Sequence, residues 1–105
     1  MEYAFETLVD PMDAAAADAA ELLKSLSNAG RLRILCALVP GDLTVSELET
    51  ALGASQSYVS GQLLRLRSEG LVACERDGRS MRYRLNDPRV RPLLERIYEV
   101  FCPVE

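Results

Sequence analysis

The stretch that decides the fold is residues 43–70, LTVSELETALGASQSYVSGQLLRLRSEG, which carry the start and stop signals of two helices. Thr44 and Glu47 have the spacing of a capping box, which predicts a short helix that ends at the next glycine. Ser55 is an N-cap residue for a longer helix, and Gly70 marks its end. A short helix, a tight turn and a longer helix are the order of a helix-turn-helix.

The longer helix has two different faces. Val59, Leu63 and Leu66 recur at helical spacing and predict a buried apolar stripe. The opposite side carries hydroxyl, amide and guanidinium groups, which can read base edges and phosphates in a major groove. We therefore predict DNA contacts from the capping residue Ser55 and from Ser57, Tyr58, Ser60, Gln62 and Arg65.

The segments beside this motif predict two further helices and a hairpin. Alanine-rich residues 14–27 predict a helix that starts near Pro11 to Asp13, and residues 31–39 predict a second helix. Residues 71–85 predict two short strands joined around an Asp-Gly pair, which is a strong hairpin signal. The hairpin corresponds to the wing of a winged helix-turn-helix.

A last helix follows the hairpin. Asp87 is its expected cap and Pro88 lies in its expected first turn. Its apolar stripe consists of Val90, Leu94, Ile97 and Phe101. We expect a mainly α fold of about five helices with a β-hairpin wing, in a single domain over residues 1–105.

Charge is distributed unevenly along a chain whose net charge is −4. Residues 54–91 contain eight arginines against four acidic residues, which gives this window a charge of +4 inside an acidic protein. A basic window in a helix-turn-helix favours phosphate contacts, and we predict them from Arg79 and Arg82 on the hairpin. A solvated charged face is the alternative, as is a module that only binds other proteins.

Composition excludes several other classes of function. The hydrophobic content of 49% and the charged content of 27% are ordinary for a soluble domain, and there is no apolar run long enough to span a bilayer. The acidic N-terminus has no signal-peptide pattern, so we expect a cytoplasmic location. The chain has no histidine, no phosphate-binding loop and no cofactor motif, so we expect neither an enzyme nor a cofactor.

Three segments together resemble the ArsR/SmtB family of repressors, over nearly all of residues 20–102. They are LLKSLSNAGRLRIL, LTVSELETALGASQSYVSGQLLRLRSEGLV and RDGRSMRYRL. The resemblance implies a homodimer assembled through the first and last helices, with Leu94, Ile97 and Phe101 at the interface. It also implies binding to an inverted-repeat DNA operator that an inducer releases.

The same resemblance places DNA-contacting positions at Gln56, Ser57, Ser60, Gln62 and Arg79. Gly61 stands where relatives usually carry a larger polar residue, so one base contact is in question.

The inducer is the remaining question for a member of this family. The chain lacks the Cys-x-Cys pair and the histidines that metal-sensing members use, so we predict no metal site. Cys36 and Cys102 resemble the sensor pair of the sulfide- and redox-responsive subgroup typified by SqrR, BigR and HlyU. That resemblance implies a disulfide or polysulfide bridge formed by reactive sulfur species or oxidants, which weakens DNA binding. A soft metal or another inducer is the alternative, and we expect Cys74 to be structural.

Overall fold

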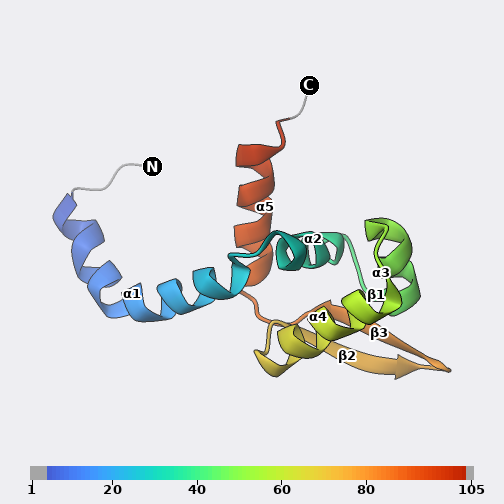
Figure 1. Ribbon diagram of the computed structural model, residues 1–105. Coiled ribbons are helices and arrows are strands. Elements are labelled where there is room, and N and C mark those ends of the chain that lie inside the picture. Colours follow the sequence, from blue (N-terminus) through green and yellow to red (C-terminus); the bar gives the residue numbers. More distant parts are fainter. Residues whose placement is uncertain (1–4, 104–105) are drawn as a thin grey trace.

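The computed structural model describes residues 5–103 (Figure 1). The helices are α1 (Phe5–Leu26), α2 (Ala29–Ala37), α3 (Val45–Leu52), α4 (Gln56–Ser68) and α5 (Val90–Phe101). The strands are β1 (Leu43–Thr44), β2 (Val72–Asp77) and β3 (Ser80–Leu85). The predicted winged helix-turn-helix with five helices is confirmed for this part of the chain. Among the described residues, no helix is long and apolar enough to cross a membrane.

Local capping explains where the helix-turn-helix begins and ends. Thr44 and Glu47 form the predicted capping box, with the Thr44 hydroxyl accepting the Glu47 N–H at 3.1 Å and the Glu47 carboxylate accepting the Thr44 N–H at 2.9 Å. Gly53 ends α3 in the left-handed conformation, with a φ of 63°, which glycine adopts without a Cβ penalty. The Ser55 hydroxyl accepts the Tyr58 N–H at 3.2 Å and so caps α4. These bonds set the turn between the two helices.

Two helix starts differ from the prediction. The first helix begins at Phe5 rather than near Pro11, and the proline lies inside it. A proline within a helix removes one hydrogen bond without ending it where the flanking residues favour a helix, as the alanine-rich segment does. The last helix begins at Val90, and no side chain caps it. Asp87 instead accepts the Arg89 N–H at 2.9 Å and pairs with its guanidinium, in a turn that precedes the helix.

The wing is part of a three-stranded antiparallel sheet in the order β1-β3-β2. Strand β1 pairs with β3 through Leu43 opposite Tyr83, and the sequence analysis did not predict it because it is only two residues long. The β2 and β3 strands are joined by Gly78 and Arg79, with Gly78 at a φ of 67°. A positive φ at the first position of a two-residue loop is typical of hairpin turns that match the strand twist.

The core lies between α2, α3, α4 and the sheet, and the end of α1 and the start of α5 also contribute to it. Its buried side chains are Leu22, Leu26, Ile34, Leu35, Leu38, Leu48, Val59, Leu63, Leu66, Leu71, Val72, Val90 and Leu94. The predicted stripe of α4 is therefore buried. Leu94 is 1% exposed and therefore belongs to the core of the protomer, and its place at a dimer interface stays a prediction.

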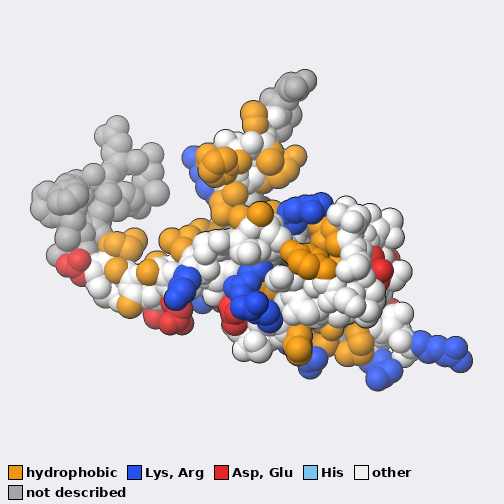
Figure 2. All heavy atoms as spheres, in the orientation of Figure 1, with side chains coloured by type: hydrophobic (Ala, Val, Ile, Leu, Met, Phe, Trp, Pro, Cys, Tyr) orange, Lys and Arg blue, Asp and Glu red, His pale blue; other side chains and the backbone are white. Residues whose placement is uncertain are grey.

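The outer parts of α1 and α5 extend away from this core in different directions (Figure 1). The radius of gyration is 15.9 Å, whereas a compact domain of this length has about 13 Å. Large apolar side chains are exposed along both helices: Met12 and Leu23 on α1, and Tyr98, Val100 and Phe101 on α5. Figure 2 shows hydrophobic side chains along the described parts of both helices. An isolated protomer therefore leaves two apolar helices uncovered.

Candidate DNA-binding surface and thiol site

The N-terminal turns of α4 present polar side chains to solvent. Ser55, Gln56 and Ser57 are exposed, and Gln56 Nε2 donates a hydrogen bond to Ser60 Oγ at 2.9 Å. The amide and the hydroxyl thus hold each other in place one turn apart. The side-chain amide oxygen of Gln56 remains available as a hydrogen-bond acceptor on this face.

Tyr58 lies where α4 approaches α2. A Cβ built on Gly30 of α2 would lie 1.9 Å from the Tyr58 hydroxyl oxygen, so the two helices meet here with no room for a side chain. Tyr58 is nevertheless 43% exposed, which leaves part of its ring on the surface. Tyr58 was predicted to contact DNA, and its contact with Gly30 was not predictable because no local pattern shows which helix a tyrosine meets.

Gln62 faces the junction between α1 and α2. It lines a hollow of about 650 Å³ together with Arg65, Lys24 and Asn28. The side-chain amide oxygen of Gln62, Oε1, is buried and has no hydrogen-bond partner among the described residues. Arg65 is exposed at the same hollow. These two residues, which the sequence predicts to contact DNA, therefore lie beside polar residues of α1 and of the turn between α1 and α2.

The two predicted arginines of the wing have different surroundings. Arg79 is exposed in the hairpin turn, and Figure 2 shows basic side chains at this tip. Arg82 instead donates to the Asp42 carbonyl at 3.0 Å and lies 3.9 Å from carboxylate oxygens of both Glu47 and Asp77. Arg82 therefore joins the wing to the start of α3, and its guanidinium is already occupied by protein groups.

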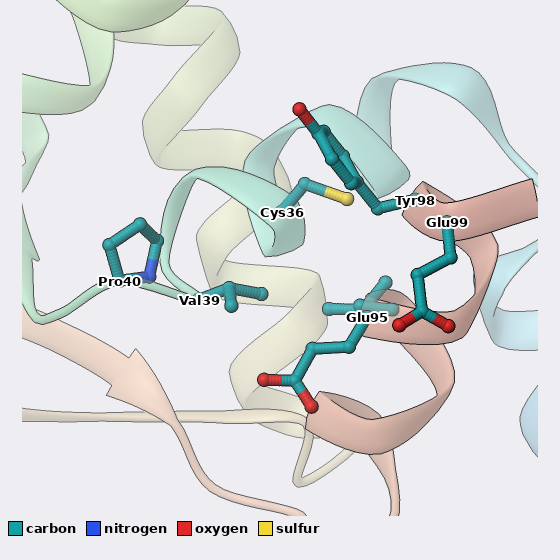
Figure 3. Close-up of a pocket in the computed structure, with 7 residues that line it drawn as sticks. Cys36, Val39, Pro40, Glu95, Tyr98 and Glu99 are labelled. Carbon is teal, nitrogen blue, oxygen red and sulfur yellow. The ribbon is translucent and has the colours of Figure 1, made fainter. Parts of the chain in front are cut away.

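A cavity of about 570 Å³ separates α2 from α5 (Figure 3). Cys36 lines it from α2, and Figure 3 shows the sulfur directed toward Tyr98 of α5. The other lining residues are Val39, Pro40, Leu94, Glu95 and Glu99. Cys36 is half-buried, so its thiol lies in an apolar wall but remains accessible through the cavity.

Cys102 lies directly after α5 and is exposed. Its N–H donates to the Tyr98 carbonyl at 2.8 Å, which places Cys102 one helical turn beyond the tyrosine that Cys36 faces. Burial raises the pKa of the Cys36 thiol above its usual value, and the neighbouring Cys102 raises that pKa further because two thiolates repel. Both thiols are free, and they are near enough for their charges to interact.

The segment between Cys36 and β1 is held by two arginines. Arg91 of α5 donates to the Val39 carbonyl, and Arg82 of β3 donates to the Asp42 carbonyl. Neither bond was expected, since each joins residues 40 or more positions apart in sequence. The segment after α2 is thus tied to α5 at one end and to the wing at the other.

Two other predictions concern metals and Cys74. Within the described residues, no group of three or more cysteine, aspartate and glutamate side chains is arranged to hold a metal ion. The soft-metal alternative therefore lacks a ligand set in this part of the chain. Cys74 is half-buried in β2 opposite Tyr83, and its proximity adds to the burial that raises the tyrosine pKa. This position in the sheet agrees with a structural residue.

Comparison with known proteins places these features in one family. Residues 28–73 match the model for bacterial regulatory proteins of the arsR family. The chain is 38% identical over 96 residues to the biofilm growth-associated repressor of Xylella fastidiosa, which covers 91% of this chain and 84% of that protein. It is 36% identical over 91 residues to the transcriptional activator HlyU of Vibrio cholerae, covering 87% and 84%.

This chain belongs to the ArsR family.

Solved structures of ArsR-family relatives agree with this fold. The repressor BigR of Xylella fastidiosa superimposes with a TM-score of 0.84 at 37% identity, covering 90% of this chain and 97% of that one. A structure of reduced HlyU from Vibrio cholerae has a TM-score of 0.80 at 36% identity, covering 88% and 97%. A homodimeric winged helix-turn-helix DNA-binding domain from Mycobacterium bovis has a TM-score of 0.70 at 34% identity, covering 85% and 83%.

The relatives named here are transcriptional regulators rather than enzymes, in agreement with the prediction. This ArsR-family protein thus has two candidate sites, one on each side of α2. The residues that the sequence predicts to contact DNA lie on α4 and at the hairpin turn, whereas Cys36 lies on α2 and Cys102 directly follows α5. The site residues named from the sequence remain predictions. The bonds of Arg91 and Arg82 to the segment after α2 could not be predicted from the sequence, because each joins distant parts of the chain.

Proposed function

We propose that this ArsR-family protein is a cytoplasmic, homodimeric repressor that binds an inverted-repeat DNA operator and senses reactive sulfur species or oxidants through Cys36 and Cys102. One observation carries the sensor proposal. Cys36 faces α5 one turn from Cys102, and Cys102 adds to the burial that raises the pKa of the Cys36 thiol. The absence of a metal-ligand group in the described residues favours thiol chemistry over a metal inducer.

The DNA-binding part of the proposal is supported by the exposed polar turns of α4 and by Arg79. In a helix-turn-helix the second helix enters the major groove, and a dimer positions two such helices one DNA turn apart. The exposed apolar side chains of α1 and α5, including Phe101 at 75% exposure, are the surface that a second copy would cover. The homodimeric relative from Mycobacterium bovis supports this arrangement.

Repression is the direction of control that we propose. The relative from Xylella fastidiosa is named a repressor, whereas HlyU of Vibrio cholerae is named an activator. A protein that covers promoter DNA blocks transcription without needing further contacts, so repression is the simpler outcome. A reporter gene with the operator inside its promoter distinguishes the two directions.

Either a persulfide or a peroxide can oxidise the two thiols to a disulfide in a balanced reaction. An organic persulfide, RSSH, transfers its outer sulfur to one cysteine thiolate and leaves as the thiol RSH. The second cysteine thiolate then attacks the cysteine sulfur of that persulfide, and the transferred sulfur leaves as hydrogen sulfide. Two thiols are oxidised to one disulfide while the sulfane sulfur is reduced. Hydrogen peroxide oxidises one cysteine to a sulfenic acid and releases one water, and the second thiol then forms the disulfide and releases a second water.

A bridge between Cys36 and Cys102 would act on the wing through the segment after α2. It would draw the end of α5 toward α2, and the Arg91 bond to the Val39 carbonyl would carry that displacement into the segment. The Arg82 bond to the Asp42 carbonyl and the pairing of β1 with β3 connect the segment to the wing. A change in wing and helix spacing lowers affinity for half-sites at a fixed separation.

The experiment is a mobility-shift assay on an inverted-repeat duplex selected from random DNA by the reduced protein. We expect reduced protein to bind with an affinity that falls as salt rises, and polysulfide or peroxide to release the DNA. Mass spectrometry should show the link between Cys36 and Cys102 in the released protein. Cys36→Ser and Cys102→Ser should keep DNA bound after treatment, and Cys74→Ser should behave as wild type. Release that is unchanged in both sensor variants refutes the proposal.

A further inference from the structure

The cavity beside Cys36 has uncharged residues on one wall and two carboxylates on α5. One wall is uncharged and includes Val39, Pro40 and the ring of Tyr98. The only charged side chains that line it within the described residues are the carboxylates of Glu95 and Glu99, both on α5 (Figure 3). A reagent that approaches the Cys36 thiol therefore passes two acidic groups and meets no cation on the cavity lining.

The two carboxylates are not equivalent. Glu99 is paired with Arg96 at 3.1 Å, so a neighbouring cation partly balances its charge. Glu95 has no ion-pair partner among residues 11–103. Arg91 lies one turn earlier on α5, but its guanidinium is directed to the Val39 carbonyl. Glu95 is thus the carboxylate of the cavity lining that has no ion-pair partner among residues 11–103.

An uncompensated carboxylate affects charged and uncharged reagents differently. Two like charges about 7 Å apart in water repel enough to slow an encounter by roughly threefold for each negative charge on the reagent. A neutral reagent, such as hydrogen peroxide or a protonated persulfide, is not repelled. The effect weakens as salt screens the charges, with a Debye length of about 8 Å at physiological ionic strength.

We propose that Glu95 is a specificity-determining residue of the thiol site, which selects uncharged thiol-reactive species and disfavours anionic ones. The proposal rests on the proposed function for its biological meaning, since it concerns which inducers reach Cys36. The selectivity of the Cys36 site for uncharged reagents is independent of DNA binding and can be measured without DNA. It predicts that persulfides and polysulfides react through their neutral forms more readily than through their anions.

The test uses two alkylating reagents of the same chemistry and different charge, iodoacetamide and iodoacetate. Rates are measured by mass spectrometry in a Cys74→Ser/Cys102→Ser background, so that only Cys36 reacts. The ratio of the iodoacetamide rate to the iodoacetate rate is divided by the same ratio for free N-acetylcysteine. The result reports how strongly the site prefers the uncharged reagent, and we call this preference the charge filter. Because the same Cys36 thiolate attacks both reagents and displaces iodide from each, a change in the Cys36 pKa cancels from the ratio.

We expect Glu95→Gln to lower this ratio about threefold at low salt, and Glu95→Asp to keep it near the value of the parent. Glu49→Gln on α3 removes the same charge from elsewhere in the protein and should leave the ratio unchanged. High salt should lower the parent ratio toward that of Glu95→Gln. A ratio that Glu95→Gln does not change, or that Glu49→Gln lowers equally, overturns the proposal.

The failure of this proposal is distinguishable from the failure of the proposed function. If Glu95→Gln lowers the ratio while thiol reagents never release DNA, the charge filter stands and the sensor function fails. If DNA release requires both cysteines but the ratio is the same in Glu95→Gln, the sensor stands and the charge filter is refuted.

Discussion

Gly30→Ala is the substitution whose effect follows most directly from the geometry. The added methyl group would lie 1.9 Å from the Tyr58 hydroxyl oxygen and 3.2 Å from its ring carbon Cζ. Because real Cβ contacts under 3.0 Å are essentially never seen, the hydroxyl must withdraw by about 1.1 Å. Tyr58 belongs to the first turn of α4, so this displacement occurs on the proposed DNA-reading surface.

The expected magnitudes differ for stability and for DNA binding. Overpacking in a well-packed core costs about 1–3 kcal/mol, but Tyr58 is 43% exposed and can turn toward solvent. Alanine also gains up to about 1 kcal/mol over glycine in a helix. We therefore expect the free energy of unfolding of Gly30→Ala to stay within about 1 kcal/mol of wild type. DNA affinity should fall about tenfold, the equivalent of about 1.4 kcal/mol for one lost polar contact.

Gly61→Ala is the matched control, because a Cβ at Gly61 of α4 meets nothing within 4 Å. It should raise the free energy of unfolding by up to about 1 kcal/mol, or the melting temperature by about 4–8 °C. Urea unfolding and fluorescence anisotropy on the selected duplex measure the two quantities. In a Tyr58→Phe background, the cost of Gly30→Ala should become smaller, because the hydroxyl oxygen at 1.9 Å is removed while the contact of 3.2 Å with Cζ remains. If Gly30→Ala alone stabilises as much as Gly61→Ala and binds DNA as tightly as wild type, the proposed steric role of Gly30 is wrong.

Three further predictions concern capping, pH and coupling. Ser55→Ala should lower the free energy of unfolding by about 1 kcal/mol in urea titrations, because it removes the acceptor that caps α4; an unchanged midpoint would contradict this. The Thr44 N–H lowers the pKa of Glu47 below its ordinary value of 4.5, so the stability it provides is present above that pH and lost as pH falls through the lowered pKa. Wild type should therefore lose more stability than Glu47→Gln between about pH 5 and about pH 3 in thermal scans, and parallel losses would refute the assignment. Arg91→Gln should form the linked Cys36–Cys102 species at the normal rate but release less DNA, whereas Arg96→Gln should release it normally; equal release by both in mobility-shift assays would exclude Arg91 from the coupling.

Much of the helix-turn-helix was predictable from the sequence because its determinants are local. The Thr44–Glu47 capping box and the Ser55 cap involve residues three positions apart, and the structure contains both as predicted. The start of α1 was not predictable from Pro11, since a proline is compatible both with a first turn and with a helix interior. The outcome there depended on the flanking residues rather than on the proline.

By itself the sequence determined which helices form, which of their faces are apolar, and which residues carry thiols and guanidinium groups. The tertiary structure decided which part of an apolar stripe is core: on α5 Leu94 is enclosed, whereas Phe101, two turns later, is exposed. It also decided that Arg82 binds the protein while Arg79 remains exposed, and that Cys36 faces the turn of α5 before Cys102. The physical reason is the distance along the chain over which each interaction acts. Capping and helical periodicity act over one or two turns, whereas burial and charge pairing depend on segments that only folding brings together.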